Sequence, residues 1–408
     1  MTTLAPASAA GIQLAVIGAG PAGLSLALHA ARTLPAATVT LYDARALEAD
    51  IARDPRTLAL SLGSVQLLQR LGAWNTDRAQ PILEVHVSQQ PPGWGRSGEP
   101  QLRIRASEED VPMLGAVLAY GEIVAPLQAA WLAATEREPQ RLRTRFGTPV
   151  AGLKNLADGV EVDAGIVERF DLAVVAEGGV FSDQARKAIT HDYRQTAWVG
   201  RVTIEGGTPG TAYERFTRHG PAALLPLKGA DATAPQTLGA ALVWCVSADD
   251  DPVRELDDAQ RLTVMASLFH PSVGRLVGVS PLKHFALGLN AERTLVDGRT
   301  VRIGNAAQTL HPVAGQGLNL GLRDAFELVR ALAAAKAGAQ GIDAVLRHLE
   351  WQRAPDRWGM IAATDFLARS FTWHWPGLGA ARSLGIASLE ALAPLKSALA
   401  RQMMFGSR

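Results

Sequence analysis

Residues 14–23 have the sequence LAVIGAGPAG, which decides the fold of the chain. The first four residues are apolar, as is typical of a central strand buried on both faces of a parallel sheet. Gly18 permits a tight turn, Gly20 lets the backbone approach a pyrophosphate, and Gly23 lets a helix pack close to the sheet. We expect that helix over residues 24–32, with free N–H groups and a partial positive charge at its start.

A second strand is expected over residues 38–42, and it ends on Asp43. An acid at this point can accept hydrogen bonds from the two hydroxyls of an adenosine ribose. Strand, glycine turn, helix, strand and acid therefore follow in the required order. The pattern indicates a bound adenine dinucleotide rather than a structural turn, but it does not distinguish NAD from FAD.

A second glycine-rich stretch covers residues 302–321, with the sequence RIGNAAQTLHPVAGQGLNLG. We expect a strand to end at Gly304 and a helix to begin near Gly317. Glycines there let the backbone approach a flat ring, and the N–H groups of the helix face it. Such a site suits the pyrimidine edge of a flavin, because reduced flavin is negatively charged near N1 and O2. The alternative, a connection that binds nothing, does not account for so many special residues.

The second stretch resembles the GDxxHxxxPxxGQGxNxGxxD signature of the class A flavoprotein monooxygenases. Within that family it is similar to the hydroxylases of ubiquinone biosynthesis. Further similarities are the segments DPRTLALS at 54–61, YERFTRHGP at 213–221 and LVWC at 242–245. The resemblance extends from about residue 12 to the end of the sequence, and its motifs are specific as a set.

The resemblance implies an α/β fold like that of para-hydroxybenzoate hydroxylase. Such a fold has a Rossmann-type FAD domain, an inserted antiparallel β-sheet that binds substrate, and C-terminal helices. We expect the FAD-binding domain to comprise residues 1–80, 108–190 and 291–340. Residues 81–107 would join the substrate sheet of residues 191–290. Residues 341–408 would be helical, with breaks at Pro355, Pro376 and Pro394.

The resemblance also assigns roles to individual residues. Those that would hold the ADP half of FAD are Gly18, Gly20, Gly23 and Asp43. Arg56 would lie over the phosphates or the ring, and Gly304 and Asn305 would contact the ribityl chain or the pyrophosphate. The residues that would line the isoalloxazine are Pro312, as a wall of the ring, with Gly315, Gln316, Gly317, Leu318 and Asn319.

The chain departs from the family pattern in two places. Asn305 stands where the family has Asp, and Gln308 stands where it has His. An asparagine can still hydrogen-bond phosphate or ribose hydroxyls, but it has no charge. In the segment AEGGVFS at 176–182 the acid is Glu177 instead of Asp, and Ser182 comes one residue late. Because that motif is linked in the family to pyridine-nucleotide use, the direct reductant of the flavin stays open.

The chemistry that the resemblance implies is aromatic hydroxylation. NADPH or NADH would reduce the FAD, O2 would be the co-substrate, and a flavin C4a-hydroperoxide would transfer a hydroxyl group to a polyprenylated phenol such as 2-octaprenyl-6-methoxyphenol. His311 is the candidate for a direct role, through a hydrogen bond to the phenol or proton transfer. A histidine that fixes the loop is an equally good interpretation. Arg215, Arg218 and His219 would guide an anionic ligand or form a solvated face, and we favour the latter.

Three alternatives remain from the sequence. A paralogous ubiquinone-pathway hydroxylase would act at another ring position. An NAD-dependent dehydrogenase would explain the first glycine motif but needs no second one. A flavin-bearing scaffold with little activity would serve other ubiquinone-biosynthesis proteins as its partners, and the altered Glu177 segment is compatible with it.

Composition gives weaker indications. The formal net charge is +1 and there is no long basic run, so nothing points to nucleic acid. The single cysteine, Cys245, is expected in a buried strand. His284, His348 and His374 have no metal-ligand spacing, so we predict no metal site.

No apolar stretch reaches membrane-spanning length, so we expect a cytoplasmic protein or one peripheral to the inner face of a membrane. Leucines between Leu384 and Leu399 predict a helix that packs on the body or meets a membrane or partner protein.

Overall fold

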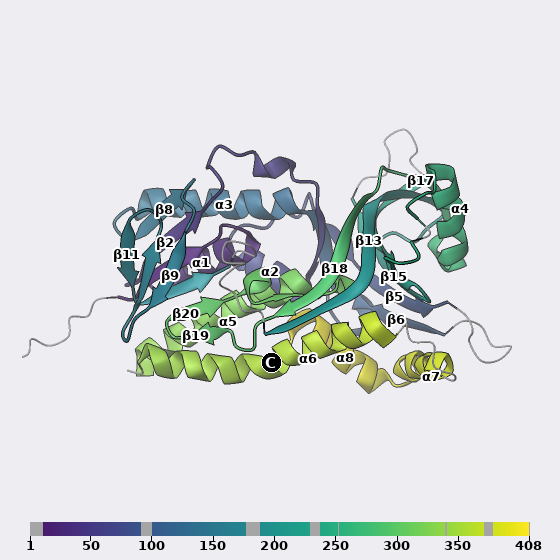
Figure 1. Cartoon of the computed structure of the whole chain (residues 1–408). Helices are drawn as coiled ribbons and strands as arrows, with labels where there is room; N and C mark the ends of the chain where they lie inside the picture. The colour runs from purple at the N-terminus through teal and green to yellow at the C-terminus, as the bar shows by residue number, and fades with distance from the viewer. Residues whose placement is uncertain are drawn as a thin grey trace, which may run out of the picture.

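The structure is a computed structural model of the chain. It describes residues 11–90, 100–176, 188–228, 237–251, 253–338, 341–370 and 378–407. Two large sheets lie side by side, and helices α5 (Gln316–Gly338) and α6 (Ile342–Ser370) run along the lower part of the view in Figure 1.

The first sheet has six strands in the order β19-β20-β12-β1-β2-β8. Their bounds are β1 (Gln13–Ile17), β2 (Thr38–Asp43), β8 (Leu142–Phe146), β12 (Leu172–Val175), β19 (Val296–Asp297) and β20 (Thr300–Arg302). All neighbours are parallel except β19 and β20. The apolar run of β1 is buried on both faces, as its sequence predicts. Leu14 and Val16 face the helices, whereas Ala15 and Ile17 face a small antiparallel sheet.

The layers on the two faces of this sheet differ. Helices α1 (Pro21–Thr33), α3 (Tyr120–Arg137) and α5 contribute to the core on one face. The other face is covered by the three-stranded sheet β11-β10-β9, with β9 (Gly152–Asn155), β10 (Val160–Asp163) and β11 (Val167–Phe170). The carboxyl ends of β1 and β2 therefore meet the start of α1, where the first glycine motif lies.

The second sheet has nine strands in the described residues, in the order β21-β18-β13-β16-β15-β14-β5-β6, with β17 paired to β13. Their bounds are β5 (Glu84–Gln89), β6 (Gln101–Arg105), β13 (Ile189–Glu205), β14 (Thr211–Thr217), β15 (Gly220–Leu227), β16 (Thr237–Ser247), β17 (Arg275–Val279), β18 (Lys283–Ala291) and β21 (Gln308–Thr309). The sheet is antiparallel except where β5 runs parallel to β14. Helix α4 (Asp258–Leu268) covers one face, over Trp198 and Trp244.

A third sheet joins the two large ones to the C-terminal helices. It has the order β3-β7-β4, with β3 (Thr57–Ser61), β4 (Gln80–Ile82) and β7 (Gly115–Ala119). Residues of α2 (Leu62–Arg70), α7 (Leu378–Ala391) and α8 (Ala393–Phe405) share one apolar cluster with it, which includes Leu62, Ile386 and Met404. The C-terminal helices thus pack against a segment from the first third of the chain.

Most of the predicted strands and helices are present at the positions that the sequence indicates, with three corrections. The one helix expected between Leu384 and Leu399 is two, because α7 ends at Ala391 and α8 begins at Ala393. Pro355 does not break a helix but lies inside α6. Arg215 is not part of a solvated face, because it is buried and its Nε donates to the carbonyl oxygen of Leu268 at 2.9 Å. Pro394 lies in the first turn of α8, as a helix start allows. Pro376 and His374 lie outside the described residues.

No helix in the described part of the chain combines the length and the apolar character that crossing a membrane requires. Cys245 is buried in β16, as predicted. The boundaries proposed for the domain segments stay a prediction.

Candidate functional site

The first glycine motif forms a turn that leaves space in front of α1. Gly18 has φ +102°, which an L-residue with a side chain rarely adopts. A Cβ on Gly23 would lie 1.9 Å from the Gly18 oxygen, so no side chain fits there. A Cβ on Gly20 would meet only the Tyr120 hydroxyl, at 3.4 Å. The N-terminus of α1 therefore faces open space, as a pyrophosphate requires.

Asp43 closes this turn from β2. Its Oδ2 accepts from the Ala19 N–H at 2.5 Å, and its Oδ1 accepts from the Arg45 N–H at 2.7 Å. A carboxylate has about four acceptor sites, so further hydrogen bonds to ribose hydroxyls remain available.

Arg45 is a residue of this region that sequence reasoning missed. Its guanidinium carbon lies 5.3 Å from the ring centre of Phe146, and its Nη2 donates to the Ala19 oxygen at 3.5 Å. The buried Nη1 has no hydrogen-bond partner among the described residues. A buried cationic N–H without a partner is costly, and an anionic group in front of α1 would satisfy it. In the sequence, its position two residues after Asp43 could have indicated that Arg45 lies at the cofactor site.

Arg56 is held at the edge of the space by two neighbours. It forms an ion pair with Asp54 at 2.8 Å, and its guanidinium lies over the Tyr120 ring at 4.1 Å from the centre. The Arg56 side chain lowers the pKa of the Asp54 carboxyl. Because Tyr120 also lies near Gly20, Arg56 belongs to the same region as the first glycine motif.

The second glycine motif approaches the first one directly. A Cβ on Gly321, in α5, would lie 2.7 Å from the Cα of Gly304. A Cβ on Gly304, whose φ is +58°, would lie 3.6 Å from the Cβ of Ala22 in α1. The starts of α1 and α5 are thus adjacent, although almost 300 residues separate them. Around Gly317, in the first turn of α5, a Cβ would meet nothing within 4 Å. A second helix N-terminus therefore also faces open space.

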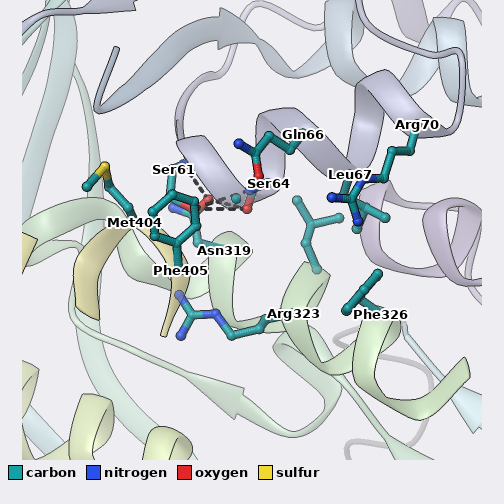
Figure 2. Close-up of a pocket in the computed structure, with 12 residues that line it drawn as sticks. Ser61, Ser64, Gln66, Leu67, Arg70, Asn319, Arg323, Phe326, Met404 and Phe405 are labelled. Atoms are coloured by element: carbon teal, nitrogen blue, oxygen red, sulfur yellow. Dashed lines mark hydrogen bonds between the residues drawn. The ribbon is translucent and has the colours of Figure 1, made fainter. Parts of the chain in front are cut away.

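Asn319 fixes this second motif, but it does so through protein atoms. Its Oδ1 accepts from the Ser61 N–H and the Ser64 hydroxyl, both at 2.8 Å. Its Nδ2 donates to the carbonyl oxygens of Ala59 and Gly315, both at 3.0 Å. Figure 2 shows Asn319 pointing toward Ser61 and Ser64, in a pocket lined by α2, α5 and α8. The side chain is fully used inside the protein, so a contact to a ring would come from its backbone.

The remaining residues predicted for the ring are distributed around this loop. Gln316 is buried, Pro312, Gly315, Gly317 and Leu318 are half-buried, and Asn305 is exposed. Gly315 has φ +58°, so glycine suits the loop there. Their contacts to a cofactor stay a prediction.

His311 is buried, and both of its ring nitrogens have protein partners. Its Nδ1 accepts from the Val313 N–H at 3.2 Å, and its Nε2 lies 2.9 Å from Oε1 of Gln195. Tyr193 packs edge-on against the ring at 5.1 Å between centres. Burial lowers the pKa of His311 to about 4, so the ring is neutral near pH 7. These are the contacts of a histidine that fixes the loop.

Gln308, which replaces the usual histidine of the family, belongs to a buried ionic cluster. Its Oε1 accepts from Arg357 Nε at 2.7 Å, and its Nε2 donates to Asp324 at 3.4 Å. Arg353 pairs with both Asp324 and Asp356 at 2.8 Å. An amide can accept and donate at the same time, so Gln308 connects a cation to an anion. Sequence reasoning missed Asp324, although it is the last residue of the family signature.

The described residues fit FAD. Two helix N-termini face open space at glycines, an unsatisfied arginine N–H lies beside one of them, and the neutral, apolar loop of His311 to Val313 lies beside the other. In that arrangement the start of α1 would hold the pyrophosphate, and the start of α5 would face the negatively charged edge of a reduced flavin. Glu177 and Ser182 lie outside the described residues.

Known proteins are similar to the chain over most of its length. A family model described as "FAD binding domain" matches residues 236–364. Ubiquinone hydroxylase UbiL of Rhodospirillum rubrum is 31% identical, and the match covers 95% of this chain and 88% of that protein. The 3-demethoxyubiquinol 3-hydroxylase of Escherichia coli is 28% identical, over 94% of this chain and 96% of that protein.

Solved structures show the same fold at low sequence identity. Klebsiella pneumoniae HpxO, complexed with FAD and uric acid, has a TM-score of 0.68 and 16% identity, covering 95% of this chain and 97% of that one. The p-nitrophenol 4-monooxygenase PnpA of Pseudomonas putida has a TM-score of 0.67 and 15% identity, covering 97% and 98%. The predicted fold class is thereby confirmed.

The contact between Gly304 and Gly321 provides a test of the cofactor site. Gly321→Ala is expected to push the two segments apart, destabilise the protein by about 1–3 kcal/mol and weaken FAD binding by roughly tenfold or more. The matched control is Gly359→Ala on α6, where a Cβ meets nothing within 4 Å. That control should keep FAD binding and gain up to about 1 kcal/mol. Urea unfolding and fluorescence titration of FAD measure both. Equal FAD affinity in the two variants would contradict the role of this contact.

Proposed function

Because this chain belongs to the family of FAD-dependent ubiquinone hydroxylases, we propose that it hydroxylates the ring of a polyprenylated phenol, with 2-octaprenyl-6-methoxyphenol as the substrate. The N-termini of α1 and α5, which both begin at glycine-rich turns, lie next to each other beside the loop of His311 to Val313. This observation carries the proposal. The relatives named as ubiquinone hydroxylases support the substrate class.

Bound FAD would supply the activation of O2, with NADPH or NADH as the electron donor. The protein chain positions the cofactor and the substrate and determines their surroundings. The backbone N–H groups at the starts of α1 and α5 would bind the pyrophosphate and the ring edge. The His311 to Val313 loop would exclude water from the reacting centre, since Val313 is buried against Phe216.

The substrate proposal is tested with the purified protein. We expect a flavin absorbance spectrum, release of FAD on denaturation, and NADPH- or NADH-dependent conversion of 2-octaprenyl-6-methoxyphenol to a product heavier by one oxygen. Mass spectrometry and NMR of the product would locate the new hydroxyl group. Hydroxylation of only a differently substituted ring would favour the paralogous activity. Flavin reoxidation that yields only peroxide with every ring substrate would favour the scaffold instead.

We assign His311 a positioning role. His311→Ala is expected to keep FAD but lose hydroxylation, because the hydrogen bonds to Val313 and Gln195 disappear. Since burial lowers the pKa of His311 to about 4, the wild-type rate should show no histidine ionisation near its usual value of about 6.5. A pH–rate profile and the FAD absorbance of the variant measure these effects. Full turnover by His311→Ala would remove the residue from the mechanism.

We also propose that the corner between α7 and α8 contacts a membrane that carries the substrate. Three leucines on these helices and between them are largely exposed: Leu384 in the middle of α7 by 69%, Leu392 between the helices by 53% and Leu395 near the start of α8 by 50%. Their neighbours Ile386 and Met404 are buried against the body, so the helices are packed on one side only. Arg401, on the same helix as Leu395, pairs with Glu109 at 3.6 Å, but its side chain is 71% exposed and would remain accessible to anionic lipid.

Liposome flotation tests this surface. The wild type should float with vesicles of phosphatidylcholine and phosphatidylglycerol, and the triple substitution of Leu384, Leu392 and Leu395 by Asp should not. Ile166→Asp is the matched control, because Ile166 is 78% exposed in the turn before β11. Flotation of the triple variant to the wild-type extent would refute the surface.

A further inference from the structure

The strand β13 is irregular where it passes the His311 loop. Its pairing with β18 shifts register between Asp192 and Gln195. Within this shift Arg194 has φ +51°, and its N–H donates to Asp192 Oδ1 at 2.8 Å. Irregularities of this kind redirect side chains and are frequent next to active sites. Here the irregularity places Gln195 against His311.

The hydrogen bonds of His311 determine the orientation of the Gln195 amide. A neutral imidazole has one donor nitrogen and one acceptor nitrogen. Because Nδ1 accepts from the backbone N–H of Val313, Nε2 carries the proton and donates it. Its partner at 2.9 Å must therefore be the oxygen of Gln195 and not its nitrogen. The Gln195 NH2 group consequently points away from His311.

That NH2 group has no acceptor among the described residues. Gln195 is 4% exposed as a residue, and none of the hydrogen bonds found there uses its Nε2. This nitrogen is not one of the fully buried side-chain atoms that lack a partner, so it stays within reach of a molecule from outside. A donor that a buried histidine holds in a fixed direction, and that is reachable from outside, can bind an acceptor of a ligand.

The sheet face that carries Gln195 suits an aromatic ring. Side chains two residues apart on a strand share a face, as do those directly across the ladder. Gln195 therefore shares its face with Ala197 and Val199 of β13, and with Ser247, Cys245 and Val243 across in β16. Val199 and Val243 are only half-buried, whereas Trp198 and Trp244 on the opposite face are buried under α4.

The same face meets the loop that follows His311. Phe216 of β14 lies in one apolar cluster with Val313. A ring lying between this face and the loop would be next to apolar side chains and the Gln195 amide.

We infer that Gln195 binds the phenolic oxygen of the substrate through its Nε2–H. The inference rests on the proposed function, and it adds the residue that orients the ring. The hydrogen bond fixes which ring carbon is presented for hydroxylation, and it stabilises the negative charge that the oxygen gains when the phenol ionises. His311 acts through Gln195, because it holds the amide oxygen and so directs the nitrogen.

The test compares two probes on the FAD-loaded protein. One is a 2-prenyl-6-methoxyphenol with a single isoprene unit, and the other is its methyl ether, whose oxygen is a poorer acceptor and cannot ionise. Dissociation constants come from the change in flavin absorbance. Wild type should bind the phenol roughly tenfold more tightly than the ether, as expected for one hydrogen bond. In Gln195→Met this preference should fall to about onefold while FAD binding is unchanged.

A second variant separates loss of the donor from loss of the His311 contact. Gln195→Glu keeps an oxygen for His311 Nε2–H and removes the NH2 group. At about pH 8, well above the ordinary glutamate pKa, its carboxylate should also abolish the preference for the phenol. Gln128→Met on α3, a half-buried glutamine away from the loop, should keep the wild-type preference.

The outcomes are distinct. A wild-type preference for the phenol in both Gln195 variants would overturn the inference and leave the proposed function standing. A wild type that binds neither probe and hydroxylates no phenol would overturn the proposed function, and the inference with it.

Discussion

The contact between two glycine backbones, Gly304 and Gly321, is the constraint on which the rest of the structure depends. Since no side chain fits between them, α5 begins directly beside the start of α1 at the end of the six-stranded sheet. Two helix N-termini at one place concentrate unpaired N–H groups and positive potential there. A dinucleotide whose pyrophosphate and reduced flavin ring are both negatively charged can then lie across the sheet edge. Asn319 extends this arrangement, because three of its four hydrogen bonds tie the start of α5 to β3 and α2.

The parts of this arrangement that depend on local sequence were predictable. The run from Leu14 to Asp43 contains its own strand, turn and helix signals. Each glycine there is needed by residues close to it in the sequence, for the turn, for the approach of a ligand or for helix packing. The loop after Gly304 was recognisable for the same reason. The class of fold and the cofactor follow from these two segments, and the relatives bear both out.

Other features depend on partners that are distant in the chain, and the sequence alone does not reveal them. Asn319 was expected at the ring, yet three of its four hydrogen-bond partners come from residues 59–64, which only the fold brings close. Gln195 carries no motif, and an irregular strand pairing decides its direction. Pro355 continues a helix that its own chemistry disfavours, and the ion pairs of Arg353 with Asp324 and Asp356 lie in that helix and on its neighbour.

Asp356 also accepts hydrogen bonds from Gln402 Nε2 at 3.0 Å and from the Ser407 N–H at 3.3 Å. Between them Gly406 has φ +76°, and a Cβ there would lie 2.4 Å from Nη1 of Arg323. The ionic cluster that braces α5 is therefore completed by residues 402–407. On the ribosome, the two glycine motifs are made long before these residues emerge. Until these residues are made, Asp356 lacks the Gln402 and Ser407 donors, and the ion pairs that hold α5 are less firmly fixed. Stable binding of the flavin should therefore follow the synthesis of residues 402–407.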